Sequence, residues 1–178
     1  LTDEAGQPVV VYHGTRGDFD ELDFSTGLGV HVGPAEAAVN RIGIKDAEDI
    51  YGTRGRMSNL GREKSPARVI PMYVNLKRPL RLTEEATGRP GEGTWDANSV
   101  IRRVMEDAET KGVPGISEAE IDAWYDDELG FGDVVFSDAY VTERELDDAV
   151  KGWLKSKGYD GIVYDNAFEG GGDSYILF

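Results

Sequence analysis

The sequence predicts an α+β fold, and three observations lead to that class. Segments rich in β-branched and aromatic residues lie near both ends of the chain, and amphipathic helical patterns lie mostly between them. No fixed internal period, as in repeat proteins, appears. Strands grouped apart from the helices favour α+β over an alternating parallel-sheet fold, and 178 residues are enough for one compact domain.

The N-terminal part predicts two strands and a helix. Residues 8–12 are typical of a buried strand, which runs directly into the polar sequence His-Gly-Thr at 13–15. Residues 29–32 alternate as a second short strand. A helix is expected over 34–41, because the proline that opens it is tolerated in a first helical turn.

A third strand is predicted in the middle of the chain. Residues 68–76 are rich in β-branched and aromatic side chains, and Pro71 within them indicates an edge position or a bulge. The segment 77–82 is expected to continue this strand after a break at Pro79.

Helices are expected in the region that follows. A stripe of apolar residues predicts a helix over 98–111. Ser117 with Glu120, and Thr142 with Glu145, match the capping box that begins a helix by satisfying its free N–H groups. Each pair therefore predicts a helix start.

The C-terminal part predicts two more strands. The last helix ends at Gly158, and a strand follows over 159–166. A flexible glycine-containing turn over 167–172 then leads to the closing strand, 173–178.

Composition and charge limit the class of function. Apolar residues make up 39% of the chain and aromatic residues 10%, which predicts a folded protein, and no apolar run approaches the ~18 residues of a membrane span. The absence of cysteine excludes disulfides and thiolate metal sites. The formal net charge of −15 disfavours general binding to nucleic acid, because it repels phosphate backbones.

The charges are unevenly distributed along the chain. Residues 51–68 hold five basic residues and one acidic residue, and residues 117–148 hold twelve acidic residues and one basic residue. The acidic stretch is typical of a solvated helical face. The basic stretch, which is rich in glycine and serine, fits either a surface loop or a loop that meets an anionic ligand.

Several familiar sites are absent from the sequence. Two histidines cannot supply a histidine-rich metal cage, and neither H-E-x-x-H nor G-x-G-x-x-G nor a Walker loop occurs. The nearest glycine pattern, "GLGVHVG" at 27–33, has the wrong spacing. We therefore expect no metal and no simple phosphate loop.

The segment 1–7 has the character of a linker. We therefore expect residues 1–178 to form a single domain that is part of a longer protein.

Three motifs occur in order along the chain: "VYHGT", "GLGVHVGPAEAAVNR", and "GYDGIVYDN" with "GGGDSYILF". Together they resemble the ADP-ribosyltransferase superfamily, on the branch of the poly(ADP-ribose) polymerases and diphtheria-type toxins. The chain is most similar to the ADP-ribosyltransferase domains of phage and mobile-element polyvalent proteins. The resemblance covers nearly the whole chain and is weakest over 83–140, which we expect to be a helical insertion.

The resemblance implies a split β-sandwich with peripheral helices that holds NAD, as a substrate, in a cleft between two small sheets. By the same resemblance, His13 would bond a ribose hydroxyl of the adenosine half, and the backbone of Gly14 would pair with the nicotinamide carboxamide. Glycine would be needed there because it lets backbone approach a ligand closely. Thr15 would lie in the same cleft.

The second motif departs from the polymerase pattern. Where that branch has G-x-Y with a tyrosine stacked on nicotinamide, this chain has Gly29-Val30-His31, and the imidazole of His31 could take the stacking role. The helix that follows would form a wall of the cleft. We expect the basic stretch 51–68 to be mobile and to border that cleft.

The third motif leaves the catalytic carboxylate open between three residues. The family has a glutamate at the start of the last strand, and alignment puts Ser174 at that position, one residue after Asp173. Because serine carries no charge, Asp173 is expected to turn inward through a bulge allowed by the glycines at 170–172. Glu169 on the turn is the other carboxylate within reach.

Three functions follow from the resemblance. The first is a mono-ADP-ribosyltransferase that cleaves the nicotinamide glycosidic bond of NAD and modifies a protein or nucleic-acid acceptor, with protein favoured by the charge. The second is a catalytically degenerate module that keeps the fold and serves a larger phage or mobile-element protein by binding NAD or by interaction with other parts. An NAD-dependent RNA phosphotransferase is the third, and the charge of −15 disfavours it.

Overall fold

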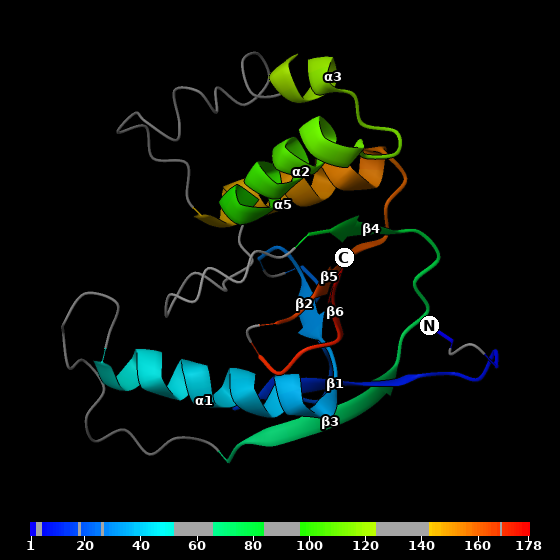
Figure 1. The fold of residues 1–178 in the computed structure, drawn as a ribbon. Coiled ribbons are helices and arrows are strands. Elements are labelled where there is room, and N and C mark those ends of the chain that lie inside the picture. Colours follow the sequence, from blue (N-terminus) through cyan, green and yellow to red (C-terminus); the bar gives the residue numbers. More distant parts are fainter. Residues whose placement is uncertain are drawn as a thin grey trace.

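The computed structural model describes residues 1–2, 5–17, 19–25, 27–51, 66–83, 97–123, 143–167 and 169–178. Its elements follow one another along the chain as shown in Figure 1: β1 Val10–Thr15, β2 Val30–Val32, α1 Ala35–Tyr51, β3 Arg68–Tyr73, β4 Pro79–Leu82, α2 Ala97–Lys111, α3 Glu118–Ala123, α5 Glu143–Ser156, β5 Gly161–Asp165 and β6 Asp173–Leu177. Strands and helices are segregated, which confirms the α+β class.

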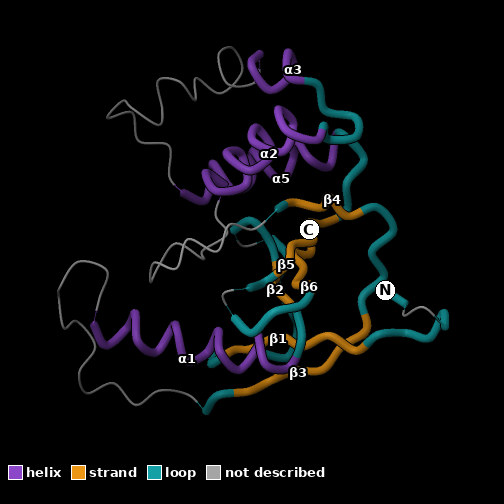
Figure 2. The backbone as a smooth tube through the Cα atoms, in the orientation of Figure 1, coloured by secondary structure: helices purple, strands orange, loops and turns teal. Residues whose placement is uncertain are grey.

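The strands form two sheets (Figure 2). The smaller sheet pairs β1 with β3, and the larger sheet has the order β2-β6-β5-β4. All neighbours are antiparallel except β4 and β5. A bridge between Tyr12 and Gly33, with N–O distances of 2.8 and 3.0 Å, joins β1 to the residue that follows β2. The two sheets therefore meet at this point and separate beyond it, which fits the expected split arrangement.

Helices cover the two sheets separately (Figure 1). α1 packs along β1, while α2 and α5 pack together beside the larger sheet. The main apolar cluster is formed by buried side chains from this sheet and these two helices, and it includes Val100, Val150, Leu154, Ile162 and Ile176, all of them 0% exposed. Burial of this kind provides most of the free energy that holds helices on a sheet.

The structure confirms two local features expected from the sequence. Pro71 lies in β3, an edge strand of the smaller sheet, where its missing N–H is tolerated. The Ser117–Glu120 capping box is formed. The Ser117 N–H donates to the Glu120 carboxylate at 3.0 Å, and the Glu120 N–H donates to the Ser117 hydroxyl at 3.3 Å. The ammonium of Lys157, and then Ser117, lower the pKa of Glu120 to about 2.

Two expectations about elements are wrong. The helix expected over 34–41 runs to Tyr51, because Gly43 costs only about 1 kcal/mol in a helix interior and does not end it. The segment 77–82 does not continue β3. The carboxylate of Asp160 accepts the N–H groups of residues 77 and 78, at 2.6 and 3.0 Å, and the chain then enters the other sheet beside β5.

Three predicted segments lie wholly or partly outside the described residues. Most of the basic stretch lies outside them, namely residues 52–65. Of the predicted insertion, residues 84–96 and 124–140 also lie outside, and the described part contains α2 and α3. Thr142 of the second capping box also lies outside them. Within the described part of the chain, no helix has the length and apolar character needed to cross a bilayer.

Candidate functional site

A cavity of about 320 Å³ lies where β1 meets β2, β6 and the first half of α1. Its volume falls in the range of small-molecule sites. Chemically active side chains from separate parts of the chain line it, together with backbone and apolar groups; among them are His13, Gly14, Phe19, Glu21, Asp23, Gly29, His31, Arg41, Tyr164, Glu169 and Ser174. The cavity thus collects residues from all three motifs of the sequence.

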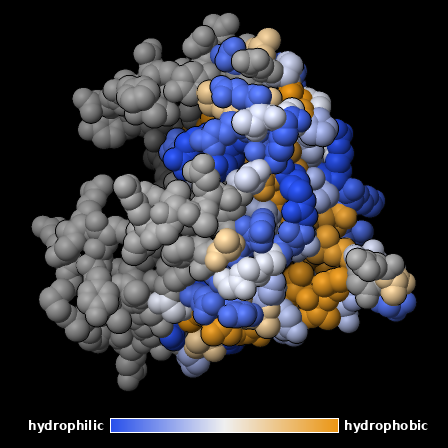
Figure 3. Space-filling view, viewed as in Figure 1, coloured by the Kyte–Doolittle hydropathy of each residue, from blue (hydrophilic) through white to orange (hydrophobic). Residues whose placement is uncertain are grey.

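A second hollow, of about 880 Å³, has a different character. It is lined mainly by apolar side chains such as Met72 and Leu76, and Figure 3 shows apolar residues gathered on the side toward which β3 runs. Two of its polar side chains are already engaged, since Asp160 caps the turn before β4 and Arg68 lies over the ring of Phe19. The first cavity is therefore the better candidate for chemistry.

The backbone of Gly14 forms one edge of the cavity. In an antiparallel pair, residues two apart direct their N–H and C=O groups to the same side. Tyr12 directs both groups at Gly33, away from β3, so Gly14 directs its own to that side as well. The backbone N–H and C=O of Gly14 therefore face the space beyond the Tyr12–Gly33 bridge.

The structure also gives a packing reason for glycine at position 14. A Cβ there would lie 2.0 Å from the carbonyl oxygen of Ala38 in α1, closer than any real contact. Glycine is thus required for α1 to pack against β1, in addition to the access of ligand to backbone that the resemblance implied.

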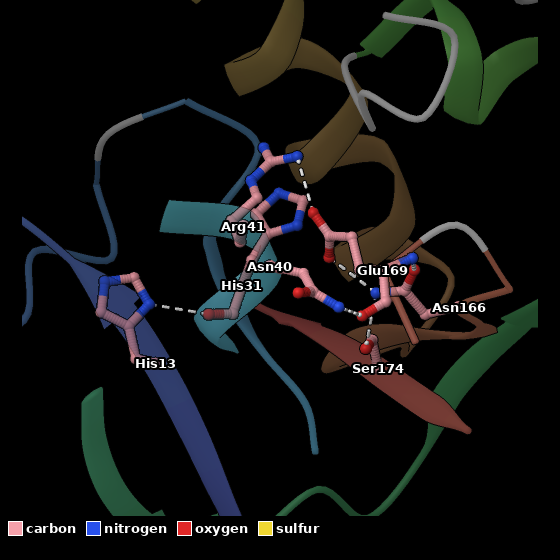
Figure 4. Close-up of polar contacts among 7 residues, drawn as sticks. All are labelled: His13, His31, Asn40, Arg41, Asn166, Glu169 and Ser174. Carbon is pink, nitrogen blue, oxygen red and sulfur yellow. Dashed lines mark hydrogen bonds and ion pairs between the residues drawn. The ribbon is translucent and has the colours of Figure 1, made fainter. Parts of the chain in front are cut away.

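His13 extends from β1 into the cavity with one ring nitrogen already bonded. Its Nδ1 lies 2.7 Å from the carbonyl oxygen of His31 (Figure 4), so Nδ1 carries a proton and donates it. In the neutral ring Nε2 is then an acceptor. Phe19 lies beside this ring, with 6.3 Å between ring centroids.

The residues of the second motif lie on the opposite wall. His31 occupies the middle of β2, is half-buried and lines the cavity. Gly29 also lines the cavity and has φ of 148°, a conformation that favours glycine. A Cβ at this position would lie 2.2 Å from the carbonyl oxygen of Leu177.

Glu169 contributes a buried carboxylate to the cavity (Figure 4). The residue is 7% exposed, and Asn166 Nδ2 donates to its Oε2 at 2.7 Å while Arg41 Nη1 lies 3.3 Å from Oε1. Its backbone is held as well, since its N–H donates to Asn166 Oδ1 at 2.9 Å and its C=O accepts from Asn40 Nδ2 at 2.7 Å. Four contacts therefore fix this residue.

A tight turn between β5 and β6 places Glu169 in this position. Asn166 N–H donates to the carbonyl oxygen of Gly172 at 2.9 Å, and its own carbonyl accepts from Gly171 N–H at 2.7 Å. Glycines 170–172 all have positive φ, between 81° and 130°, which L side chains rarely adopt. The glycine-rich turn is thus a defined hydrogen-bonded structure, and it brings a loop carboxylate over the start of β6.

Asp173 lies elsewhere. The β5–β6 ladder is regular, with Asp173 opposite Asp165 and Ser174 opposite Tyr164, so the expected bulge is absent and consecutive side chains face opposite sides. Asp173 pairs with Arg81 at 2.9 Å, and this hydrogen bond raises the pKa of Arg81. The structure therefore does not bring Asp173 into the cavity, contrary to the expectation above.

Ser174 does line the cavity and is 2% exposed. Its hydroxyl accepts from Asn166 Nδ2 at 3.0 Å, and a Cβ on Gly33 would lie only 2.3 Å from it. Thr15 does not line the cavity; its hydroxyl accepts from Gly17 N–H at 2.9 Å and stabilises the turn after β1. Of the residues expected from the sequence, Thr15 and Asp173 are the two that lie outside.

Sequence reasoning missed Arg41 and Asn166 as members of the site. Both occur inside motifs that carried the resemblance, Arg41 at the end of the second and Asn166 directly after β5. A buried polar residue that follows a strand whose first four residues are buried is the signal that could have identified Asn166. Arg41 had no such signal, because its partner is 128 residues away in sequence.

No group of three His, Asp or Glu side chains that could hold a metal ion occurs among the residues that the structure describes. The rim of the cavity instead carries exposed carboxylates, Glu21 and Asp23. Hydrogen bonds from the side chain and backbone of Ser25 hold the pKa of Asp23 below its usual value. This edge of the cavity is therefore anionic.

Comparison with known proteins gives one family match. The sequence model of the family described as "ADP-Ribosyltransferase in polyvalent proteins" matches residues 3–178. No curated protein and no solved structure matches the chain significantly. The match extends over nearly the whole chain, from the strand that carries His13 to the last strand, and it confirms the resemblance drawn from the three motifs. The chain belongs to the family of ADP-ribosyltransferase domains in polyvalent proteins.

Proposed function

We propose that this domain is an NAD-dependent mono-ADP-ribosyltransferase whose catalytic carboxylate is Glu169. The reaction breaks the bond between C1′ of the nicotinamide ribose and the nicotinamide nitrogen, and an acceptor nucleophile then bonds to C1′. The observation that carries the proposal is the buried carboxylate of Glu169 in the same cavity as His13 and the backbone edge of Gly14.

The first strand offers groups that match the two ends of this substrate. A primary carboxamide has one carbonyl and one NH₂, which pair with the N–H and C=O of Gly14 on the side that faces the cavity. Nε2 of His13 accepts a hydrogen bond from a ribose hydroxyl, because the ring proton is on Nδ1, which donates to the carbonyl of His31. These contacts set the direction in which NAD lies.

Glu169 supplies the charge that the reaction needs. Positive charge develops on the ribose as the glycosidic bond breaks, and a fixed carboxylate nearby stabilises it. Each carboxylate oxygen has two acceptor positions, and Asn166 and Arg41 use one on each oxygen. The remaining positions are available for a ribose hydroxyl.

His31 takes the place beside the nicotinamide ring in this proposal. It lies on β2, across the cavity from Gly14, and a half-buried imidazole there offers a flat face for stacking. His31 and Glu169 line the same cavity, and the close-up draws both side chains (Figure 4). The nicotinamide would thus lie between β1 and His31.

The acceptor is a protein in this proposal. The net charge of −15 and the carboxylates of Glu21 and Asp23 at the rim repel the phosphates of a nucleic acid. A polypeptide segment with basic side chains would be attracted by the same charges.

A second function rests on one specific observation. Ser174 stands on β6 where the family pattern has its glutamate, and Asp173 faces away. A domain that binds NAD or a partner without cleaving the substrate would have this composition. Glu169 from the turn is what favours the enzyme over the inactive module.

The domain should be incubated with NAD labelled in the adenosine half and a bacterial lysate, and the label resolved into protein, nucleic acid and free ADP-ribose. We expect label on protein and release of nicotinamide. Label on nucleic acid would contradict the choice of acceptor. Binding of NAD with no transfer and no nicotinamide release would favour the inactive module.

A further inference from the structure

We propose that Asn166 is a positioning residue that holds the carboxylate of Glu169 in the orientation needed for NAD cleavage. The inference rests on the proposed function, because it assigns how that site's carboxylate is aimed. Asn166 lies directly after β5 and is 1% exposed. It does not line the cavity, so it acts through Glu169 and not on the substrate.

The amide of Asn166 binds both ends of Glu169. Its Nδ2 donates to the carboxylate oxygen at 2.7 Å, and its Oδ1 accepts the backbone N–H of the same residue at 2.9 Å. One side chain that holds both backbone and carboxylate leaves Glu169 little freedom to rotate. A side-chain amide suits this role because it offers a donor and an acceptor on two different atoms.

Asn166 is itself fixed by the turn and by the neighbouring strand. Its backbone N–H and C=O are bonded to the glycines of the turn, at 2.9 and 2.7 Å. Nδ2 also donates to Ser174 Oγ at 3.0 Å, and Gly33 leaves the room that this serine occupies. The serine on β6 is therefore connected through the amide to the carboxylate on the loop.

The contact from Asn166 is the shorter and more buried of the two contacts to the carboxylate. Arg41 lies 3.3 Å away and its side chain is 21% exposed, whereas the amide lies at 2.7 Å in a buried environment. Hydrogen bonds are electrostatically stronger where water is excluded. Asn166 thus makes the shorter contact to the carboxylate and also binds the backbone N–H of the same residue.

The test is Asn166→Asp in the 178-residue domain, with NAD cleavage measured as nicotinamide release across a pH range. Aspartate keeps the acceptor for the Glu169 N–H but removes both donors and places a second carboxylate beside the first. We expect kcat to fall about 10- to 100-fold, as for loss of a hydrogen bond to a charged group, with KM for NAD within about 3-fold. The acid limb of the kcat profile should move to higher pH, because neighbouring carboxylates disfavour each other's ionised form.

Asn40→Ala is the matched control. Asn40 holds the same residue only by its backbone carbonyl, at 2.7 Å, so its loss loosens the turn without touching the carboxylate. We expect the acid limb to stay at the wild-type pH and the loss of kcat to be smaller. Equal losses and equal pH profiles in the two variants would show that the turn's rigidity matters and would overturn the inference.

A second measurement does not depend on turnover. Thermal stability of Asn166→Asp, Glu169→Gln and the double variant forms a cycle, in which the glutamine amide of the double variant can donate to the new aspartate. We expect the double variant to recover most of the loss in Tm caused by Asn166→Asp alone. Additive losses would overturn the inferred contact.

The outcomes separate this inference from the proposed function. If Glu169→Gln abolishes turnover while Asn166→Asp keeps the wild-type kcat and pH profile, the inference fails and the proposed function stands. If Glu169→Gln keeps wild-type turnover, the proposed catalytic carboxylate fails and the inference fails with it.

Discussion

At the scale of single residues, the direction of the side chains on β6 decides which carboxylate faces the cavity. Asp173 and Ser174 are consecutive on a regular strand, so they face opposite sides, and the charged residue of the two faces Arg81. The inward position holds a neutral hydroxyl. The negative charge in the cavity comes instead from Glu169 on the turn, whose carboxylate contacts Asn166 and Arg41.

The role of His13 can be tested by calorimetry with NAD. His13→Ala removes the acceptor proposed for a ribose hydroxyl and should weaken NAD binding about 3- to 10-fold, the effect of one hydrogen bond. Thr15→Val on the same strand is the comparison, because that hydroxyl caps the turn at Gly17 and lies outside the cavity. Unchanged affinity in His13→Ala would refute the placement of NAD along β1.

At the scale of elements, the close approach of α1 to β1 makes one wall of the cavity. Gly14 allows the approach, and the bridge between Tyr12 and Gly33 fixes β1 beside β2. Pro71 lies opposite Tyr12. Because the N–H and C=O of Tyr12 bond to Gly33 and not to β3, no N–H is needed from Pro71. Backbone geometry therefore sets this side of the site.

Two glycine substitutions separate packing from backbone propensity. Gly14→Ala places a Cβ against the backbone of Ala38 and should destabilise the domain by about 1–3 kcal/mol through overpacking. Gly43→Ala, in α1, meets nothing within 4 Å and should stabilise it by about 0.5–1 kcal/mol. Urea unfolding measures both. Equal effects of the two substitutions would contradict the packing described for Gly14.

The sequence predicted the local elements better than their connections. Periodicity and caps identified most of the strands and helices, because those signals lie within a few residues of one another. The separation of β3 from β4 depends on Asp160, more than 80 residues away. The length of α1 depended on a glycine that a long helix tolerates.

The candidate site was predictable to a similar degree. His13, Gly14, Gly29 and His31 were found through the motifs of the resemblance, and all four line the cavity. The orientation of the turn was not predictable, because it depends on backbone hydrogen bonds from Asn166 to Gly171 and Gly172 and on a contact from α1. Both glycines have positive φ. Glycine content alone indicated flexibility, whereas the bonded turn has one conformation.

At the scale of the whole molecule, two sheets joined at one bridge leave a cavity between them, and the protein around it is strongly acidic. A formal charge of −15 on 178 residues favours expansion through self-repulsion. α1 packs on the smaller sheet and α2 and α5 pack beside the larger sheet (Figure 1). The cavity is lined from β1, β2, β6 and α1, where the two sheets meet.

The acidic balance predicts a dependence of stability on salt. Raising NaCl from about 10 mM to about 150 mM shortens the screening length from about 30 Å to about 8 Å and should raise Tm, because repulsion between like charges is reduced. The control is the same titration near the sequence pI of about 4.5, where the increase should disappear. A fall in Tm with salt at pH 7 would show that attractive ion pairs outweigh the repulsion.

The identity of the catalytic carboxylate is the central claim, and the kcat for nicotinamide release from NAD by Glu169→Gln and Asp173→Asn tests it most directly. The account predicts a loss of about 100- to 1000-fold in Glu169→Gln, as for removal of a group that stabilises transition-state charge. Asp173→Asn should stay close to the wild type, because Asp173 pairs with Arg81 outside the cavity. Near-normal turnover in Glu169→Gln together with its loss in Asp173→Asn would contradict the account and return the catalytic role to the first residue of β6.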